Sequence, residues 1–239
     1  MKHKETDWQR DGPPSTLRAV IFDLDDTLVV STVNFGKFKT LVIDRIASWG
    51  DQRELYSPSE TIVRIVNRCE ARMRDQGTSE PETRSRLAEL DRIMDEVELE
   101  HVDETQGIEG ARELLDFLKG QGMKVGVLTR GCQEYALRAM RKTGLLHLVD
   151  ACECRNSDVK PKPNPESYQR LASTLGVDLD ETIFVGDHAI DVQCAANAGV
   201  PFIGVLTGDV PRDELIDAGS VMVFRDAKEM LEWLRSRAK

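Results

Sequence analysis

Two carboxylates, Asp23 and Asp25, follow a short apolar run near the start of the chain, in the stretch Phe-Asp-Leu-Asp-Asp-Thr-Leu at residues 22–28. Alternate side chains of an extended strand point to the same side, so we expect both carboxylates on one face, about 7 Å apart. Carboxylates placed in this way can share one reaction. An acidic loop that caps a strand is the competing interpretation, which the spacing Asp-x-Asp-x-Thr-Leu behind an apolar strand disfavours.

Further polar groups follow other apolar runs along the chain. Thr129, Arg130 and Gly131 form one group, whose hydroxyl and loop amides are suited to holding phosphoryl oxygens, although Thr before Gly is also common in simple turns. Lys160 and Lys162 lie in the stiff loop Lys-Pro-Lys-Pro-Asn-Pro, just before an expected helix. Taken alone, that loop is better explained as a solvated basic turn.

The last polar group is Gly-Asp-His-Ala-Ile-Asp at residues 186–191, which presents Asp187 and Asp191 four positions apart. Carboxylates at this spacing can face one ion across a helical turn. An ordinary helix cap, with Asp187 accepting backbone amides, is the alternative. The coincidence of all these groups with the ends of expected strands favours a common site.

Strands and helices alternate after Gly107, which predicts an α/β fold: a parallel sheet with helices on both faces. Ligands of such sheets bind beyond the carboxyl ends of the strands, where the polar groups fall. The apolar run 19–22 supplies a first buried strand. The other expected strands are 124–128, 149–153, 182–185 and 202–205, and the expected helices are 111–119, 133–142, 165–175, 190–198 and 227–237.

Residues 31–105 have helical periodicity instead and are expected to form a small α-helical cap inserted after the first strand. A breaker region at 77–81 separates the last two helices. The predicted organisation is therefore a flexible tail at 1–15, a core domain at 16–30 and 106–239, and the cap at 31–105. The three apolar stripes are Phe35, Phe38, Val42, Ile46 and Trp49, then Ile62, Val66, Cys69 and Met73, and finally Leu87, Leu90, Met94 and Val97.

The net charge of −10 argues against nucleic-acid binding by broad counterion release, which needs clustered Lys and Arg. No apolar run reaches the roughly 18 residues of a membrane-spanning helix, and the polar first ten residues lack a secretory signal. Five cysteines do not indicate a disulfide framework, and the pair Cys152 and Cys154 lacks a second pair at zinc-ligand spacing. We therefore expect a cytoplasmic protein without nucleic-acid or membrane partners, and the oligomeric state is open.

Taken in order, the motifs resemble those of the haloacid dehalogenase (HAD) superfamily of phosphohydrolases over residues 17–206. Residues 23–27 look like the first family motif, Thr129 the second, Lys162 the third and residues 186–191 the fourth. The helical insertion resembles the cap of the phosphoglycolate phosphatase-like branch. The resemblance implies a Rossmann-like core of the HAD type.

The resemblance further implies a Mg²⁺-dependent phosphatase that acts on a small phosphorylated metabolite through an aspartyl-phosphate. It makes Asp23 the nucleophile and Asp25 the general acid and base. Mg²⁺ would take the carboxylates of Asp23 and Asp187 and the backbone carbonyl of Asp25. Asp191 would bind the ion through water or orient Lys162. The implied phosphate-binding residues are Thr129, Arg130 and Lys162.

The choice of lysine is ambiguous because Lys160 and Lys162 both begin a Lys-Pro-x-Pro pattern. The family usually places its lysine about fourteen residues before the glycine that ends the next helix, and the spacing to Gly176 favours Lys162. Arg130 and His188 lie beside motif positions and either contact substrate or are a surface cation and a loop residue.

Other functions of the same fold stay open at this point. A sugar-phosphate mutase uses the same aspartyl-phosphate, and a non-catalytic phosphate- or partner-binding protein would be free to lose the motif residues, all of which are present. A dehalogenase generally lacks the carboxylate at Asp25. A phosphonatase needs a cap lysine, and neither Lys37 nor Lys39 has a convincing motif around it. Candidate substrates are phosphoglycolate, sugar phosphates, nucleoside monophosphates and pyrophosphate.

Many arginines fall in the expected cap. Any of them could pair with an anionic leaving group, but solvated helix faces are the simpler interpretation. They include Arg64, Arg68, Arg72, Arg74, Arg84 and Arg86.

Overall fold

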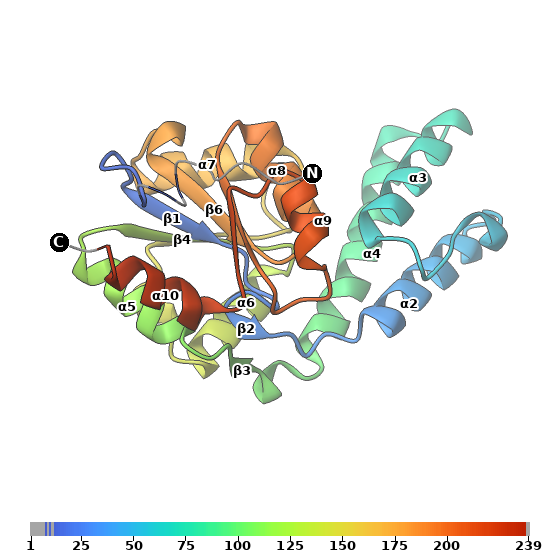
Figure 1. The fold of residues 1–239 in the computed structure, drawn as a ribbon. Helices are drawn as coiled ribbons and strands as arrows, with labels where there is room; N and C mark the ends of the chain where they lie inside the picture. The colour runs from blue at the N-terminus through green and yellow to red at the C-terminus, as the bar shows by residue number, and fades with distance from the viewer. Residues whose placement is uncertain (1–7, 9, 11, 238–239) are drawn as a thin grey trace. The chain divides into compact units, whose positions relative to one another are not determined.

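The computed structural model describes residues 8, 10 and 12–237, and its largest feature is a six-stranded parallel sheet (Figure 1). The strand order is β5-β4-β1-β6-β7-β8, so the first strand of the chain lies inside the sheet. From β1 the chain adds β4 and β5 on one side, and then β6, β7 and β8 on the other side. The strands are β1 (Ala19–Phe22), β4 (Lys124–Leu128), β5 (Ala151–Glu153), β6 (Thr182–Gly186), β7 (Phe202–Val205) and β8 (Met222–Phe224).

Helices cover both faces of this sheet (Figure 1). Crossovers between parallel strands are right-handed, so helices that connect strands in opposite directions along the sheet lie on opposite faces. One face carries α7 (Pro165–Leu175), α8 (Ala189–Ala198) and α9 (Arg212–Asp217). The other carries α5 (Ala111–Gly120), α6 (Gln133–Lys142) and α10 (Ala227–Arg235).

The interior of the sheet is apolar because its central strands are buried on both faces. All four residues of β1 are buried, and the ring of Phe184 on β6 packs between Tyr168 and Phe202, with ring centroids 5.4 and 5.8 Å away. In the register of the sheet, Phe22 is level with Val127 on β4 and Val185 on β6. The polar residues that follow these strands therefore meet at one edge.

A short antiparallel pair, β2 (Val29–Val30) and β3 (Gln106–Gly107), lies where the chain leaves and rejoins the sheet-containing part. By their contacts, the described parts of 1–31 and 103–239 form one compact unit and residues 32–102 another, which we call the helical unit. The helical unit contains α2 (Phe35–Ser48), α3 (Ile62–Asp75) and α4 (Glu80–Leu99). The domain limits expected from the sequence stay a prediction.

The three helices of the helical unit begin where polar side chains accept backbone N–H groups. Asn34, Thr61 and Ser79 accept from Lys37, Arg64 and Glu82, respectively. Such caps satisfy donors that lack a partner within the helix. The predicted apolar stripes face a shared core, except for Phe35, which is 46% exposed. The core includes Phe38, Val42, Ile43, Ile46, Ile65, Cys69, Met73, Leu90 and Met94.

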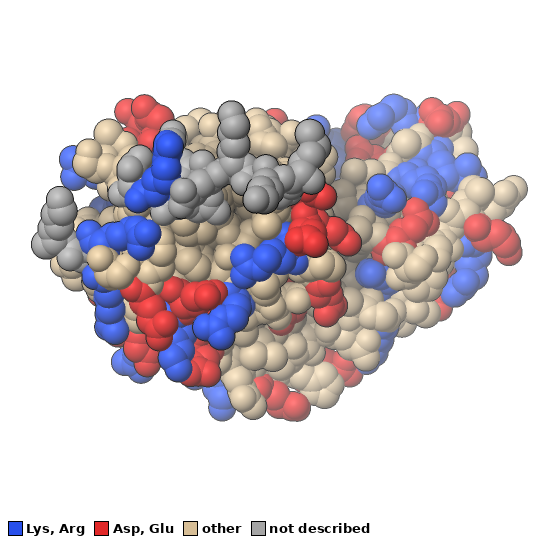
Figure 2. Space-filling view, viewed as in Figure 1, with Lys and Arg blue, Asp and Glu red and all other residues tan. Residues whose placement is uncertain are grey.

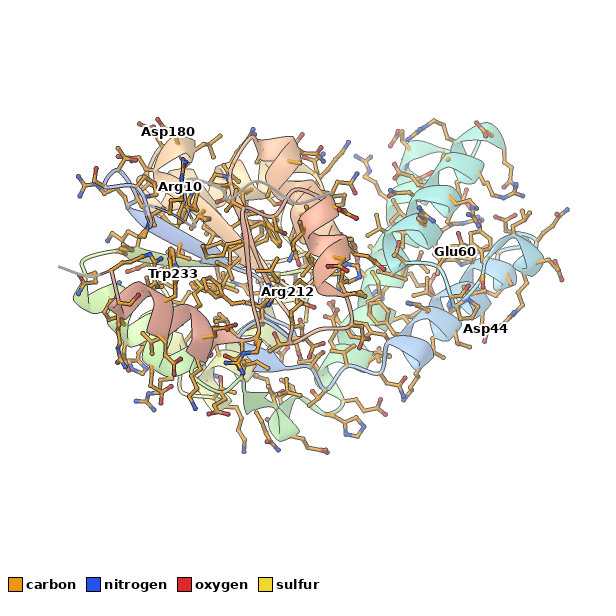
Figure 3. The ribbon with its side chains drawn as sticks, viewed as in Figure 1. Arg10, Asp44, Glu60, Asp180, Arg212 and Trp233 are labelled. Carbon is orange, nitrogen blue, oxygen red and sulfur yellow. The ribbon has the colours of Figure 1, made fainter. Side chains whose placement is uncertain are left out.

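Several arginines of the helical unit are paired with carboxylates of the same unit. Arg68 donates to Glu60 at 2.6 Å, and Arg72 donates to Asp51 at 2.6 Å. Figure 3 labels Glu60 and also Asp44, which pairs with a further arginine at 2.9 Å. These arginines therefore already have carboxylate partners within the helical unit, and the interpretation of the cap arginines as solvated helix faces stays a prediction.

The predicted α/β fold with a parallel sheet and a helical insertion is confirmed. The pair β2 and β3, the helix α9 and the strand β8 were not predicted from the sequence. Figure 2 shows acidic and basic side chains intermingled over the side that carries α5 and α10. Within the described residues, no helix is both long enough and apolar enough to span a membrane. Most of the tail expected at 1–15 falls at residues 1–7, 9 and 11, outside the described residues.

Candidate active site

Asp23 lies immediately beyond the end of β1 and is buried, with 7% of its surface exposed. Its N–H donates to the carbonyl of Val185 on the neighbouring strand, which fixes its backbone in line with the sheet. Its Oδ1 lies 2.5 Å from Nζ of Lys162. The two side chains that the first and third motifs singled out are thus in direct contact.

Lys162 is buried to 2% exposure, and its ammonium group also donates to Oδ1 of Asp191 at 2.7 Å. Burial alone would lower the pKa of Lys162, but Asp191 and Asp23 outweigh it and raise the pKa above the ordinary value. Burial raises the pKa of Asp23 although Lys162 opposes this effect. The lysine is therefore a fixed cation among more carboxylates than it can neutralise alone.

Asp187 follows β6 and accepts a hydrogen bond from the hydroxyl of Thr27 at 2.9 Å. Burial, reinforced by the nearby Asp191, raises the pKa of Asp187 to about 7. Gly208 packs against this carboxylate so closely that a β-carbon at position 208 would overlap it. Thr207, the residue before Gly208, donates through its hydroxyl to the carbonyl of Asp26. The loop after β7 thereby holds the loop after β1 beside Asp187.

Three buried carboxylates could hold a metal ion together. Asp23, Asp187 and Asp191 each offer one oxygen, and these oxygens lie within 4.8 Å of one another. A cluster of hard oxygen ligands with excess negative charge is the donor set that Mg²⁺ prefers. The residues present therefore fit the ion that the family resemblance implied.

The loop after β4 approaches the same edge of the sheet. Thr129 is buried, and its hydroxyl accepts the N–H of Gly131 at 2.9 Å. Arg130 donates from one terminal nitrogen to the backbone carbonyl of Lys162, and Arg155 donates to the carbonyl of Arg130 at 2.8 Å. These contacts tie the loop after β4 to the loop that carries Lys162.

Asp25 is half-buried, and its Oδ1 accepts a hydrogen bond from the hydroxyl of Tyr135 on α6. Tyr135 and Gly208 were not predicted from the sequence, and Thr27 was predicted only as part of the first motif, without a role of its own. The contacts of Tyr135 and Gly208 join segments far apart in the chain, and no local pattern signals them.

Other residues considered from the sequence lie elsewhere. Lys160 is exposed, so the structure brings Lys162 rather than Lys160 to Asp23. The exposed His188 precedes α8 and accepts the N–H of Ile190 on its ring nitrogen at 3.2 Å. Cys152 and Cys154 lie with their sulfur atoms 3.4 Å apart on and just after β5.

A comparison with protein families decides to which of them this arrangement belongs. The family model described as haloacid dehalogenase-like hydrolase matches residues 20–205. The chain belongs to this family. The match extends from β1 to β7 and includes each of the four motifs, so the resemblance seen in the sequence is confirmed for this HAD hydrolase.

Individual relatives agree with this assignment. The HAD hydrolase is 29% identical over 222 residues to "Phosphoglycolate phosphatase" of Rhodospirillum rubrum, covering 91% of this chain and 90% of that protein. It is 34% identical over 92 residues to "Pyrophosphatase PpaX" of Halalkalibacterium halodurans, covering 38% of this chain and 43% of that protein. A solved hydrolase from Pseudomonas syringae shares the fold with a TM-score of 0.66 and 23% identity, over 93% of this chain and all of that one.

Proposed function

We propose that this HAD hydrolase is a Mg²⁺-dependent phosphatase that cleaves a small phosphorylated metabolite through an aspartyl-phosphate on Asp23. The observation that carries the proposal is the contact between Asp23 and Lys162, because it joins a buried carboxylate to a fixed cation at the carboxyl end of β1. Relatives named as a phosphoglycolate phosphatase and a pyrophosphatase support the same reaction class.

In the first step, a carboxylate oxygen of Asp23 attacks phosphorus, and the bond between phosphorus and the leaving oxygen breaks. Covalent catalysis of this kind divides one difficult displacement into two easier ones. Lys162 balances the charge of the phosphoryl oxygens, and the hydroxyl of Thr129 donates to one of them. Arg130 stays a predicted phosphate ligand, through guanidinium nitrogens other than the one that holds the carbonyl of Lys162.

Asp25 supplies the proton that the leaving oxygen needs. It then takes a proton from the water that attacks phosphorus of the aspartyl-phosphate, and the carboxylate of Asp23 is released together with inorganic phosphate. One group can serve as acid and then as base because the two steps are chemically reciprocal.

The ion would be held by the carboxylates of Asp23 and Asp187 and by the backbone carbonyl of Asp25. When bound, Mg²⁺ neutralises charge on the phosphoryl group and orients it. Because Asp191 accepts from Lys162 at 2.7 Å, we assign to it the orientation of that lysine, with a contact to the ion through water as the alternative.

The substrate in this proposal is a small phosphorylated metabolite, and phosphoglycolate is the first candidate because of the relative's name. Sugar phosphates, nucleoside monophosphates and pyrophosphate belong on the same list. The cytoplasmic location expected from the sequence stays a prediction.

The proposal is tested by measuring phosphate release from a panel of phosphorylated metabolites, with Mg²⁺ and with EDTA, using wild type and Asp23→Asn in parallel. We expect release from at least one substrate that EDTA abolishes and that the nearly isosteric variant lowers at least about 10³-fold. Unfolding temperature and circular dichroism verify that the variant is folded. Undiminished turnover by freshly prepared Asp23→Asn would exclude the aspartyl-phosphate, and no release from any substrate would favour the mutase or the binding protein.

A further inference from the structure

Tyr135 contributes a phenol hydroxyl to the surroundings of Asp25, although the two residues are 110 positions apart in the chain. The hydroxyl donates to Oδ1 of Asp25, and the tyrosine is fully buried. We propose that Tyr135 is a positioning residue that fixes the carboxyl group of Asp25 for proton transfer. This inference rests on the proposed function, in which Asp25 is the acid and base.

The first turn of α6 positions Tyr135 next to Asp25. The N–H of Tyr135 donates to the sulfur of Cys132, the residue that caps the helix, at 3.5 Å. The tyrosine shares the buried side of α6 with Ala136, Ala139 and Met140. A packed ring of this kind has little freedom, so its hydroxyl is held in one place.

Gly131 packs against the ring of Tyr135. A β-carbon at Gly131 would lie only 2.8 Å from Cδ1 of the Tyr135 ring and 3.4 Å from the hydroxyl oxygen of Thr129. Glycine therefore lets the ring pass directly beneath the loop that carries Thr129. Through this packing, the loop after β4 and the loop after β1 share one side chain as a common support.

A donor on one oxygen restricts the rotation of the carboxyl group and so fixes the direction in which its proton is presented. Proton transfer requires the acid within hydrogen-bond reach of the leaving oxygen, and small displacements of a reacting group cost up to about 10²-fold in rate. Removing only the hydroxyl of Tyr135 should therefore impair the steps that use Asp25, while binding of the phosphoryl group is retained.

Tyr135→Phe tests this role because it deletes the hydroxyl and keeps the ring. Leaving groups that need a proton should be affected most, so we expect kcat for an alkyl phosphate such as phosphoglycolate to fall about 10- to 100-fold with KM changed less than about threefold. The rate of the first turnover on 4-nitrophenyl phosphate, measured by rapid mixing, should fall less than about threefold because nitrophenolate departs unprotonated.

A matched control is Tyr168→Phe. Tyr168 is equally buried, and its hydroxyl contacts that of Thr182 at 2.9 Å. A loss of stability without a change in the leaving-group preference is expected there. If Tyr135→Phe slowed both substrates equally, as a general packing defect would, the positioning role would be wrong.

A double-mutant cycle measures the coupling between Tyr135 and Asp25. In the Asp25→Asn background, Tyr135→Phe should cause less than a twofold further change, since the group it positions is already lost. Additive losses would overturn the inference while leaving the proposed function intact. Failure of the proposed function itself would be recognised separately, by full activity of Asp23→Asn.

Discussion

The ammonium group of Lys162 lies 2.5 Å from a carboxylate oxygen of Asp23, across 139 positions of sequence. The same ammonium group reaches Asp191 at 2.7 Å, and all three side chains are buried. A cation held in this way is already oriented before substrate arrives, so little reorganisation is needed during the reaction.

Lys162→Ala should lower kcat by about 10²- to 10³-fold, because it removes the fixed positive charge beside the proposed nucleophile. Lys160→Ala is the matched control, since Lys160 belongs to the same loop but is exposed. We expect that control to keep at least about half of the wild-type kcat. Phosphate release on the best substrate of the panel measures both, and equal losses in the two variants would contradict the assignment of Lys162.

Gly208→Ala should weaken the response to Mg²⁺, because its β-carbon would overlap the carboxylate of Asp187 and displace a proposed ligand. The concentration of Mg²⁺ that gives half-maximal activity is expected to rise at least about tenfold, in line with losses seen for disturbed metal surroundings. Gly120→Ala is the control, because a β-carbon there meets no atom within 4 Å. An unchanged Mg²⁺ titration for Gly208→Ala would show that this contact does not matter.

Asp51→Asn should make the helical unit less stable at neutral pH but not at strongly acidic pH. The hydrogen bonds from Arg72, assisted by Tyr56, lower the pKa of Asp51 to about 2, against about 3.9 for an unperturbed aspartate. A carboxyl group with a lowered pKa stabilises the fold fully above pH of about 4, and this contribution is lost as the pH falls through 2.

The measurement for Asp51 is the unfolding temperature of wild type and variant between pH 7 and pH 2. The difference in unfolding temperature between wild type and variant should be largest at pH 7 and should disappear near pH 2. Asp44→Asn is the control, because Asp44 is 53% exposed and pairs with Arg53 on the surface. A gap for Asp51→Asn that does not depend on pH would contradict the charge argument.

Long or strongly patterned segments could be predicted from the sequence. The run at 19–22 is apolar throughout because β1 is buried on both faces, and the stripes of α2, α3 and α4 follow the helical period. The strand β8 consists of three residues and β2 and β3 of two each, too short for any periodicity. The helix α9 has six residues and one buried side chain, Leu215, so it has no repeating stripe.

The site could be predicted as far as its motifs follow strands. Asp23, Thr129 and Asp187 come directly after β1, β4 and β6, and parallel neighbours place such residues at one edge. Lys162 lies in a loop, where two lysines satisfied the same local pattern. The spacing to Gly176 favoured Lys162, but its contact with Asp23 depends on tertiary packing. The contact between Tyr135 and Asp25 depends on how α6 packs, which no spacing in the sequence specifies.

The pairing of Val29 with Gly107 has a consequence for how this chain can change. The chain enters the helical unit after β2 and leaves it before β3. The hydrogen-bonded pair of β2 and β3 therefore holds the two ends of the insertion together, whatever residues lie between them. The strand order of the sheet contains none of the intervening residues. Evolution or design can therefore replace the whole insertion without changing the strand order of the sheet that positions the carboxylates.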